Sequence, residues 1–221
     1  MEKKKIMNTK FIALSGIDGA GKSTQLSLLK ERFEKSGGSV ICLWTRGGST
    51  TGSEAVKAFI RRIAGKSLPP SGHSSKRDEM LQKGWIQRVW LVLAILDLIR
   101  IYGVLVRWWV FRGKSIICDR YLWDTFIDFQ IMFPTIDIGN WFLWKILVWC
   151  TPVPDRAILL MIPLHLSEKR CLEKYEPFPD TPERRKRRYE LYEGASNNAY
   201  WDIVDSTRSV DSVFSDIISV S

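Results

Sequence analysis

A glycine-rich stretch near the N-terminus has the residue types and spacing of a phosphate-binding loop. Residues 16–23 read Gly-Ile-Asp-Gly-Ala-Gly-Lys-Ser and match the pattern G-x-x-x-x-G-K-[ST] in full. Glycines let backbone N–H groups wrap around phosphate oxygens, and the N-terminus of a following helix adds partial positive charge. We expect Lys22 to reach the β- and γ-phosphates of a nucleotide and Ser23 to hold Mg²⁺. The candidate nucleotide-binding residues are Gly16, Asp18, Gly19, Ala20, Gly21, Lys22, Ser23 and Thr24.

A second set of chemical groups, Asp119-Arg120-Tyr121, directly follows the apolar run 115–118. Phosphoryl transfer to a phosphorylated acceptor brings two polyanions together, so the site must neutralise charge and hold the oxygens in line. Asp119 is placed to bind Mg²⁺ or its waters, and Arg120 is suited to grip an acceptor phosphate with two N–H groups. The alternative for this pair is a salt bridge that caps a strand.

The elements that must position these groups alternate along the chain. Short apolar runs that predict strands are separated by segments with helical spacing of apolar residues. A strand enters the phosphate loop and a helix leaves it, which disfavours a simple glycine turn with a coincidental lysine. The alternation predicts a three-layer α/β fold with a parallel five-stranded sheet flanked by helices. The predicted strands cover residues 11–14, 40–44, 115–118, 156–162 and 201–204.

Composition narrows the function further. A chain of 221 residues suits one domain, and the formal net charge of +9 implies an anionic partner. The basic residues are spread out with no nucleic-acid motif, so nucleic acid is not expected as a partner. The four cysteines form no Cys-x-x-Cys pair, and charged residues interrupt the apolar region 85–111, so we expect neither zinc nor a membrane span but a cytoplasmic protein.

On these motifs the chain resembles the thymidylate kinase family. The resemblance runs from residues 11–25 through 116–121 and 156–160 to the arginine-rich run 184–188 and to Ile203-Val-Asp205. It implies an ATP- and Mg²⁺-dependent kinase that phosphorylates a nucleoside monophosphate, with dTMP as the default acceptor. It also implies one domain over residues 1–221 with a lid at about 171–188. The acceptor-binding residues implied by the family are Asp18, Arg46, Arg120 and Tyr121.

The basic run Arg184-Arg-Lys-Arg-Arg188 follows a proline-rich segment at the family's lid position. A closing lid could deliver an arginine to the transferring phosphoryl group and exclude water. Gly19 stands where some relatives carry arginine, a pattern that resembles members whose lid supplies the catalytic arginine. Arg184, Arg185 and Arg188 all remain candidates for that role. The alternative is a solvated helix face or a nucleic-acid patch.

Several positions depart from the family. The phenylalanine and arginine with which thymidylate kinases read the base are replaced by Ala94 and Leu98, and Arg100 should point elsewhere on the helix. Asp124 replaces the serine that follows Asp-Arg-Tyr, and Ser15 stands where a glutamate is common. These departures keep open a kinase of the same fold with a different acceptor, and a nucleotide-binding protein without catalysis.

Most of the 10 tryptophans lie between Trp85 and Trp149, on predicted helices that flank the acceptor side. We expect them to pack between helices. A homodimer face and a contact with a membrane surface are the alternatives, since Trp141-Phe-Leu-Trp-Lys145 combines aromatic residues with a cation.

Overall fold

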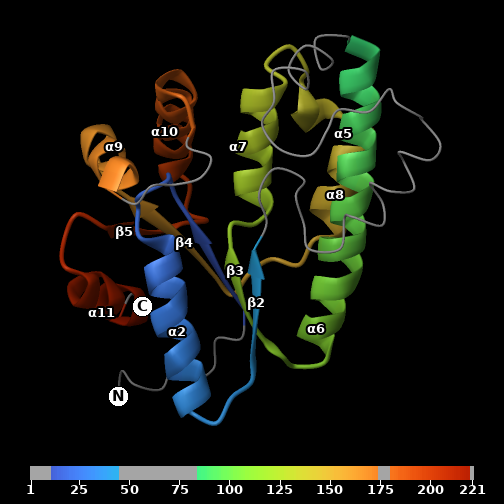
Figure 1. Ribbon diagram of the computed structural model, residues 1–221. Helices are drawn as coiled ribbons and strands as arrows, with labels where there is room; N and C mark the ends of the chain where they lie inside the picture. The colour runs from blue at the N-terminus through green and yellow to red at the C-terminus, as the bar shows by residue number, and fades with distance from the viewer. Residues whose placement is uncertain (1–10, 45–83, 174–179, 220–221) are drawn as a thin grey trace.

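A computed structural model describes residues 11–44, 84–173 and 180–219 of the chain (Figure 1). Within them, five strands alternate with helices in the predicted order. The strands are β1 (Phe11–Ser15), β2 (Val40–Trp44), β3 (Ser115–Asp119), β4 (Arg156–Met161) and β5 (Asp202–Asp205). The α-helices are α2 (Lys22–Lys35), α5 (Gly84–Leu98), α6 (Arg107–Phe111), α7 (Leu122–Met132), α8 (Phe142–Cys150), α9 (Leu164–Glu173), α10 (Pro182–Ser196) and α11 (Val210–Ser219). A π-helix, η3 (Ile99–Val106), joins α5 to α6, and a 3₁₀ turn, η4 (Ile138–Asn140), precedes α8.

The sheet is parallel throughout and has the strand order β2-β3-β1-β4-β5. The chain leaves β1 toward one edge of the sheet and, after β3, crosses β1 to continue in β4 on its other side. The strand order therefore reverses between β1 and β3, where Leu14 pairs with Asp119. In open parallel sheets, ligands bind outside the carboxyl ends of the strands at such a point. The phosphate loop follows β1 and Arg120 follows β3, so both candidate groups lie at this edge.

Two apolar layers cover the sheet because successive side chains of a buried parallel strand point to opposite faces. Ile12 and Leu14 of β1 face a core that includes Leu29 of α2 and Ile217 of α11. Phe11 and Ala13 face a second core built with α5, η3, α7 and α8. Figure 1 shows α2 and α11 on one side of the sheet and α5, α6 and α8 on the other. The three-layer α/β prediction is confirmed.

Two residues within helices are placed by contacts with distant segments. Gly103, a possible break in the helical region over residues 79–111 by its sequence, lies inside the π-helix η3, so the chain stays helical while the α-helical pattern is interrupted. A Cβ atom at this position would lie 2.7 Å from the Sγ atom of Cys150, so the glycine permits the close approach of α8. Ser167, expected to cap a helix, lies inside α9 with its side chain buried. The helix predicted around residues 53–65 lies outside the described residues.

The long helix from α5 to α6 is unusually apolar. The most apolar 18-residue window within Gln87–Phe111 has a mean hydropathy of 2.2, so by length and composition alone this helix could cross a membrane. Leu91, Ile95 and Leu98 on one face are buried in the core beside the sheet. On this face the helix covers the sheet, while 33% of the apolar window as a whole is buried. The tryptophans differ in exposure. Trp144 and Trp201 are buried, whereas about half or more of the side chain is exposed in Trp44, Trp85, Trp108 and Trp149.

Candidate active site

The loop after β1 has the backbone of a phosphate cradle. Gly16, Gly19 and Gly21 all have positive φ angles, of 138°, 80° and 87°, which side-chain-bearing residues rarely adopt. A Cβ atom on Gly16 would come within 2.4 Å of the carbonyl oxygen of Leu160, so β4 approaches too closely for any side chain. Gly21 leads directly into α2. Ser23 and Thr24 in the first turn of this helix are exposed, which leaves their hydroxyls and N–H groups open to a ligand.

Lys22 lies over this loop in a buried position. Its Nζ atom donates hydrogen bonds to the carbonyl oxygens of Gly16, at 2.9 Å, and Ile17, at 2.8 Å. Burial and the neighbouring Arg120 cation lower its pKa from 10.5 to about 8, although Asp18 opposes the shift. A phosphate bound in the loop would offset the charge that burial disfavours. The ammonium group is therefore placed where nucleotide phosphates would stabilise it.

Three side chains that the sequence analysis did not identify hold the loop from outside. Ser167 of α9 donates to the carbonyl oxygen of Asp18 at 2.6 Å, and Ser206, after β5, donates to that of Ala20 at 2.7 Å. Arg170 bonds to the carbonyl oxygen of Gly19 at 3.2 Å and to that of Ser206 at 3.1 Å. The three contacts to the loop join residues about 150 or more positions apart in the sequence, so no local sequence pattern predicts them.

The packing of α9 also explains the small residue at position 19. A Cβ atom on Gly19 would lie 3.0 Å from the carbonyl oxygen of Ser167 and 3.3 Å from the Cβ atom of Arg170. An arginine at this loop position would require α9 to shift. The absence of an arginine from the loop, noted in the sequence, thus agrees with the three-dimensional structure.

Arg120, directly after β3, and Asp18, in the loop after β1, meet in a buried ion pair between Nη2 and Oδ1. Arg120 has a φ of 71°, the only positive value among the non-glycine residues described, and its N–H group donates to the carbonyl oxygen of Leu14 at 2.9 Å. This strained backbone turns the chain away from β3 at the sheet edge. Burial would lower the pKa of Arg120, but Asp18 and other nearby acids raise it well above the ordinary value. The guanidinium therefore remains a fixed cation beside the loop.

Asp119, at the end of β3, supplies a carboxylate with spare capacity. Burial raises its pKa, while Lys22 and Arg120 oppose that shift. Its buried Oδ1 atom makes no hydrogen bond within the described residues. An oxygen ligand of this kind, with the exposed hydroxyl of Ser23, fits Mg²⁺ bound mainly through nucleotide phosphates and water. Among the described residues no three His, Cys, Asp or Glu side chains gather in a self-sufficient metal site.

Tyr121, for which the family resemblance implies an acceptor-binding role, has its side chain packed away from the phosphate loop. Its ring is buried in the second core, 5.1 Å from the ring of Phe11 and 4.6 Å from that of Tyr102. Its hydroxyl donates to the carbonyl oxygen of Pro152 at 3.0 Å. The residue next to Arg120 thus anchors α7 to the core.

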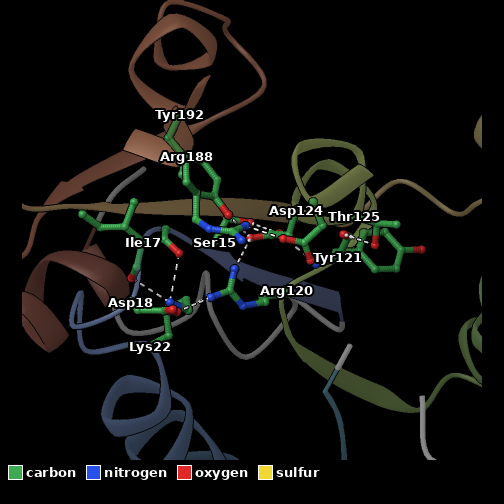
Figure 2. A network of polar contacts seen from close by, with 12 residues as sticks. Ser15, Ile17, Asp18, Lys22, Arg120, Tyr121, Asp124, Thr125, Arg188 and Tyr192 are labelled. Atoms are coloured by element: carbon green, nitrogen blue, oxygen red, sulfur yellow. Dashed lines mark hydrogen bonds and ion pairs between the residues drawn. The ribbon is translucent and has the colours of Figure 1, made fainter. Parts of the chain in front are cut away.

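Asp124, which follows one turn later, is fully buried at the centre of a polar network (Figure 2). Its Oδ2 atom accepts hydrogen bonds from Ser15 Oγ at 2.6 Å and from the N–H group of Tyr121 at 2.9 Å. Its Oδ1 atom accepts from the hydroxyl of Tyr192 and lies 4.0 Å from Nη1 of Arg120. The network joins β1, α7 and α10 beside the acceptor-side arginine.

The three candidate arginines of α10 have different surroundings. Arg188 is buried in ion pairs with Asp128 and Asp180, and Figure 2 shows it reaching down toward the polar network with Tyr192. Arg185 is also buried and bonds to the carbonyl oxygen of Asp180 at 3.3 Å, while its Nε atom has no partner within the described residues. Arg184 instead lines a cavity at the far end of α7. The helix begins two residues before the basic run, with Thr181 as N-cap and Pro182 as its first residue.

The positions at which the family reads the base lie on or near the second core. Leu98 is fully buried and Ala94 packs partly against the same core. Arg100 forms an ion pair with Asp97 at 2.8 Å, so it is engaged elsewhere, as predicted. Trp90 is partly buried against the second core, and its ring lies 5.5 Å from that of Phe133 between centroids. Arg46, the other predicted acceptor-phosphate ligand, lies outside the described residues.

Comparisons with known proteins cover nearly the whole chain. It is 30% identical over 216 residues to a probable thymidylate kinase of Pyrococcus horikoshii, covering 95% of this chain and 94% of that protein. The chain belongs to the thymidylate kinase family. It is 25% identical to the thymidylate kinases of Thermosipho africanus and Bifidobacterium longum, over 219 and 218 residues, and covers 96% and 97% of them. No protein-family model matches the chain.

Membership of this family makes the protein a nucleoside monophosphate kinase, which confirms the resemblance stated from the motifs. The family's phosphate loop and its Asp-Arg-Tyr motif meet at one sheet edge, in the part of the structure described above. The structure therefore joins the two motifs that carried the resemblance.

Proposed function

We propose that this protein transfers the γ-phosphoryl group of ATP to dTMP, forming dTDP and ADP. One observation supports this proposal above the others: the phosphate loop and the acceptor-side arginine are joined directly by the buried Arg120–Asp18 ion pair. A donor nucleotide on the loop and an acceptor phosphate on Arg120 would lie side by side at the edge of the sheet where the strand order reverses. Family membership supplies the identity of the two substrates.

On the donor side, we assign ATP to the loop of residues 16–24. The backbone N–H groups and Lys22 would bind the phosphates, and Ser23 and Asp119 would hold Mg²⁺ or its waters. Bound Mg²⁺ would supply charge neutralisation on the phosphates. The pKa of Lys22 is near 8 without ligand, and phosphates in the loop would raise it, so that the ammonium group stays fully protonated at neutral pH.

On the acceptor side, we assign the acceptor phosphate to Arg120, and Asp18 to orienting the Arg120 guanidinium group. A planar guanidinium can hold two phosphate oxygens at once, which fixes the direction of attack on the γ-phosphorus. Arg188 is the lid arginine that we favour for stabilising the transferring phosphoryl group. It is buried in the same charged region as Arg120, whereas Arg184 faces a different cavity. The single domain with a lid at 171–188 remains part of the proposal.

A second candidate is transfer to another nucleoside monophosphate. It is favoured by the base-reading positions: Leu98 is a buried core residue, and the alanine at 94 offers neither a stacking face nor a donor. A site without the donor that reads the thymine edge would lose discrimination between bases. The fold and the phosphate chemistry would be unchanged.

A panel assay separates the two. ADP production from ATP and Mg²⁺ should be measured with each of the common nucleoside and deoxynucleoside monophosphates, and with Lys22→Ala and Arg120→Ala as controls. We expect the highest kcat/KM with dTMP. A higher value with another monophosphate would establish the second candidate, and turnover with none would refute both.

A homodimer is one of the alternatives that the sequence leaves open, and a cytoplasmic location is expected from it; both remain predictions. Size-exclusion chromatography with light scattering would test the first. The exposed apolar side chains of α6 and α8, including Phe111 and Trp149, are the surface on which such an interface could form.

A further inference from the structure

Two departures from the family, at positions 15 and 124, prove to be in direct contact. Ser15 ends β1 and Asp124 lies in the first turn of α7, 109 residues later, yet Ser15 Oγ donates to Asp124 Oδ2 at 2.6 Å. The family pattern named in the sequence analysis has a glutamate at the first position and a serine at the second. The contact in this chain thus combines one hydroxyl on β1 with one carboxylate on α7, the reverse of that pattern.

The carboxylate is bound too completely to be a spare surface group. Asp124 is 1% exposed and receives three hydrogen bonds, from Ser15, from the N–H group of Tyr121 and from the hydroxyl of Tyr192. Burial and Asp124 itself raise the pKa of Tyr192 well above its ordinary value, so this tyrosine stays a neutral donor. A buried carboxylate that satisfies donors from three elements fixes those elements relative to one another.

The same carboxylate faces the acceptor-side cation. The Asp124 Oδ1 atom lies 4.0 Å from Nη1 of Arg120, whose Nη2 atom pairs with Asp18. The guanidinium thus lies between two carboxylates, one from the phosphate loop and one from α7. Arg120 leaves β3 with a φ of 71°, and its guanidinium faces Asp18 through an ion pair and Asp124 at 4.0 Å, with Asp128 and Tyr192 also nearby.

We propose that Asp124 is a positioning residue for Arg120, and that Ser15 and Asp124 are one exchanged pair whose single negative charge the site requires. Through the Tyr192 hydroxyl, the pair also links the lid helix α10 to the acceptor-phosphate arginine. This inference rests on the proposed role of Arg120 in binding the acceptor phosphate.

A reciprocal exchange tests the pair. Asp124→Ser alone leaves the donors of Ser15, Tyr121 and Tyr192 without a carboxylate, and Ser15→Glu alone places a second negative charge beside the first. The double variant, Ser15→Glu with Asp124→Ser, restores one carboxylate and one hydroxyl. We expect each single variant to lose about 100-fold in kcat/KM for dTMP and the double variant to lie within about tenfold of the wild type.

A matched control separates positioning from general loss of stability. Asp202 pairs with Arg156 at 2.8 Å where β4 and β5 begin, at the opposite end of the strands from the site. Asp202→Asn removes a carboxylate from an ion pair without touching Arg120, and we expect the KM values for both substrates to stay within about twofold. In Asp124→Asn, which keeps the side-chain size, the KM for dTMP should rise at least about tenfold, against less than threefold for ATP.

Melting temperatures of the four proteins of the exchange, without ligand, provide the second readout. If Ser15 and Asp124 act as one pair, the melting temperature of the double variant lies above the value obtained by adding the two single changes. This comparison can still be made when a single variant is largely unfolded at the assay temperature. Additive melting temperatures, or a double variant no more active than the weaker single one, would overturn the inference. Wild-type protein without dTMP turnover but with coupled melting temperatures would refute the proposed function while retaining the pair. Equal KM increases for ATP and dTMP in Asp124→Asn would refute the positioning of Arg120.

Discussion

Replacing Lys22 by methionine should reveal the energetic cost of keeping this cation buried. The pKa of Lys22 is lowered from 10.5 to about 8 in the folded protein, so between these values the unfolded chain binds more protons than the folded one. The free energy of unfolding therefore rises with pH between these two values, because the buried lysine becomes neutral in the folded protein and the cost of burying its charge is relieved. Below pH 8 both states are protonated and the full cost is present.

The magnitude follows from the two pKa values. Their difference corresponds to about 3 kcal/mol of lost stability at pH 7, of which about 1 kcal/mol is recovered at pH 9. Lys22→Met has no charge to bury, although it also loses the two hydrogen bonds to loop carbonyls. The difference in unfolding free energy between variant and wild type should therefore shrink by about 1 kcal/mol from pH 7 to pH 9.

Urea unfolding without nucleotide, at pH 7, 8 and 9, measures this difference. Lys30→Met is the matched control, because Lys30 lies on the same helix, is half exposed and forms only a surface pair with Glu34. The control should show no comparable dependence on pH. A constant difference for Lys22→Met across this range would refute the lowered pKa and the argument built on it.

The same linkage predicts how ATP binds. Phosphates in the loop favour protonated Lys22, so ATP binding near pH 8 should take up a fraction of a proton. The dissociation constant for ATP should rise above pH 8, toward about tenfold per pH unit. Calorimetry in two buffers of different ionisation enthalpy would detect the proton. No uptake would show that Lys22 is already fully charged in the free protein.

Three further substitutions test the loop and the lid. Gly19→Ala should destabilise the protein by about 1 kcal/mol and weaken ATP binding, because the φ of 80° at Gly19 disfavours a side chain and α9 lies close by. Chemical denaturation measures the stability and ATP titration the affinity, and an unchanged affinity for ATP would contradict the prediction. Ser206→Ala removes the donor to the Ala20 carbonyl and should raise the KM for ATP more than that for dTMP, by severalfold in steady-state assays. Arg188→Ala should lower kcat at least about 100-fold at saturating substrate, whereas Arg184→Ala should change it less than fivefold; the reverse order in single-turnover measurements would assign the lid role to Arg184.

Helix and strand positions could be predicted closely where local chemistry decides them. The strand before Gly16, the helix after it and the strand before Asp119 occur where the apolar spacing indicated, since these patterns depend on near neighbours. Errors arose where distant packing overrides local signals. Position 103 has room for no side chain because Cys150 packs against it, and Ser167 bonds to the loop rather than to its own helix end.

The sequence by itself determined the chemistry available to this protein: a glycine loop with a lysine, and an Asp-Arg pair after a strand, each fixed by adjacent residues. Only the tertiary structure decided which of these groups meet. Sheet order places β1 beside β3, so Asp18 pairs with Arg120 from 102 residues away. It also brings Ser15 to Asp124, turning two separate departures into one compensated contact. Such contacts depend on strand order and helix packing, which no short stretch of sequence encodes.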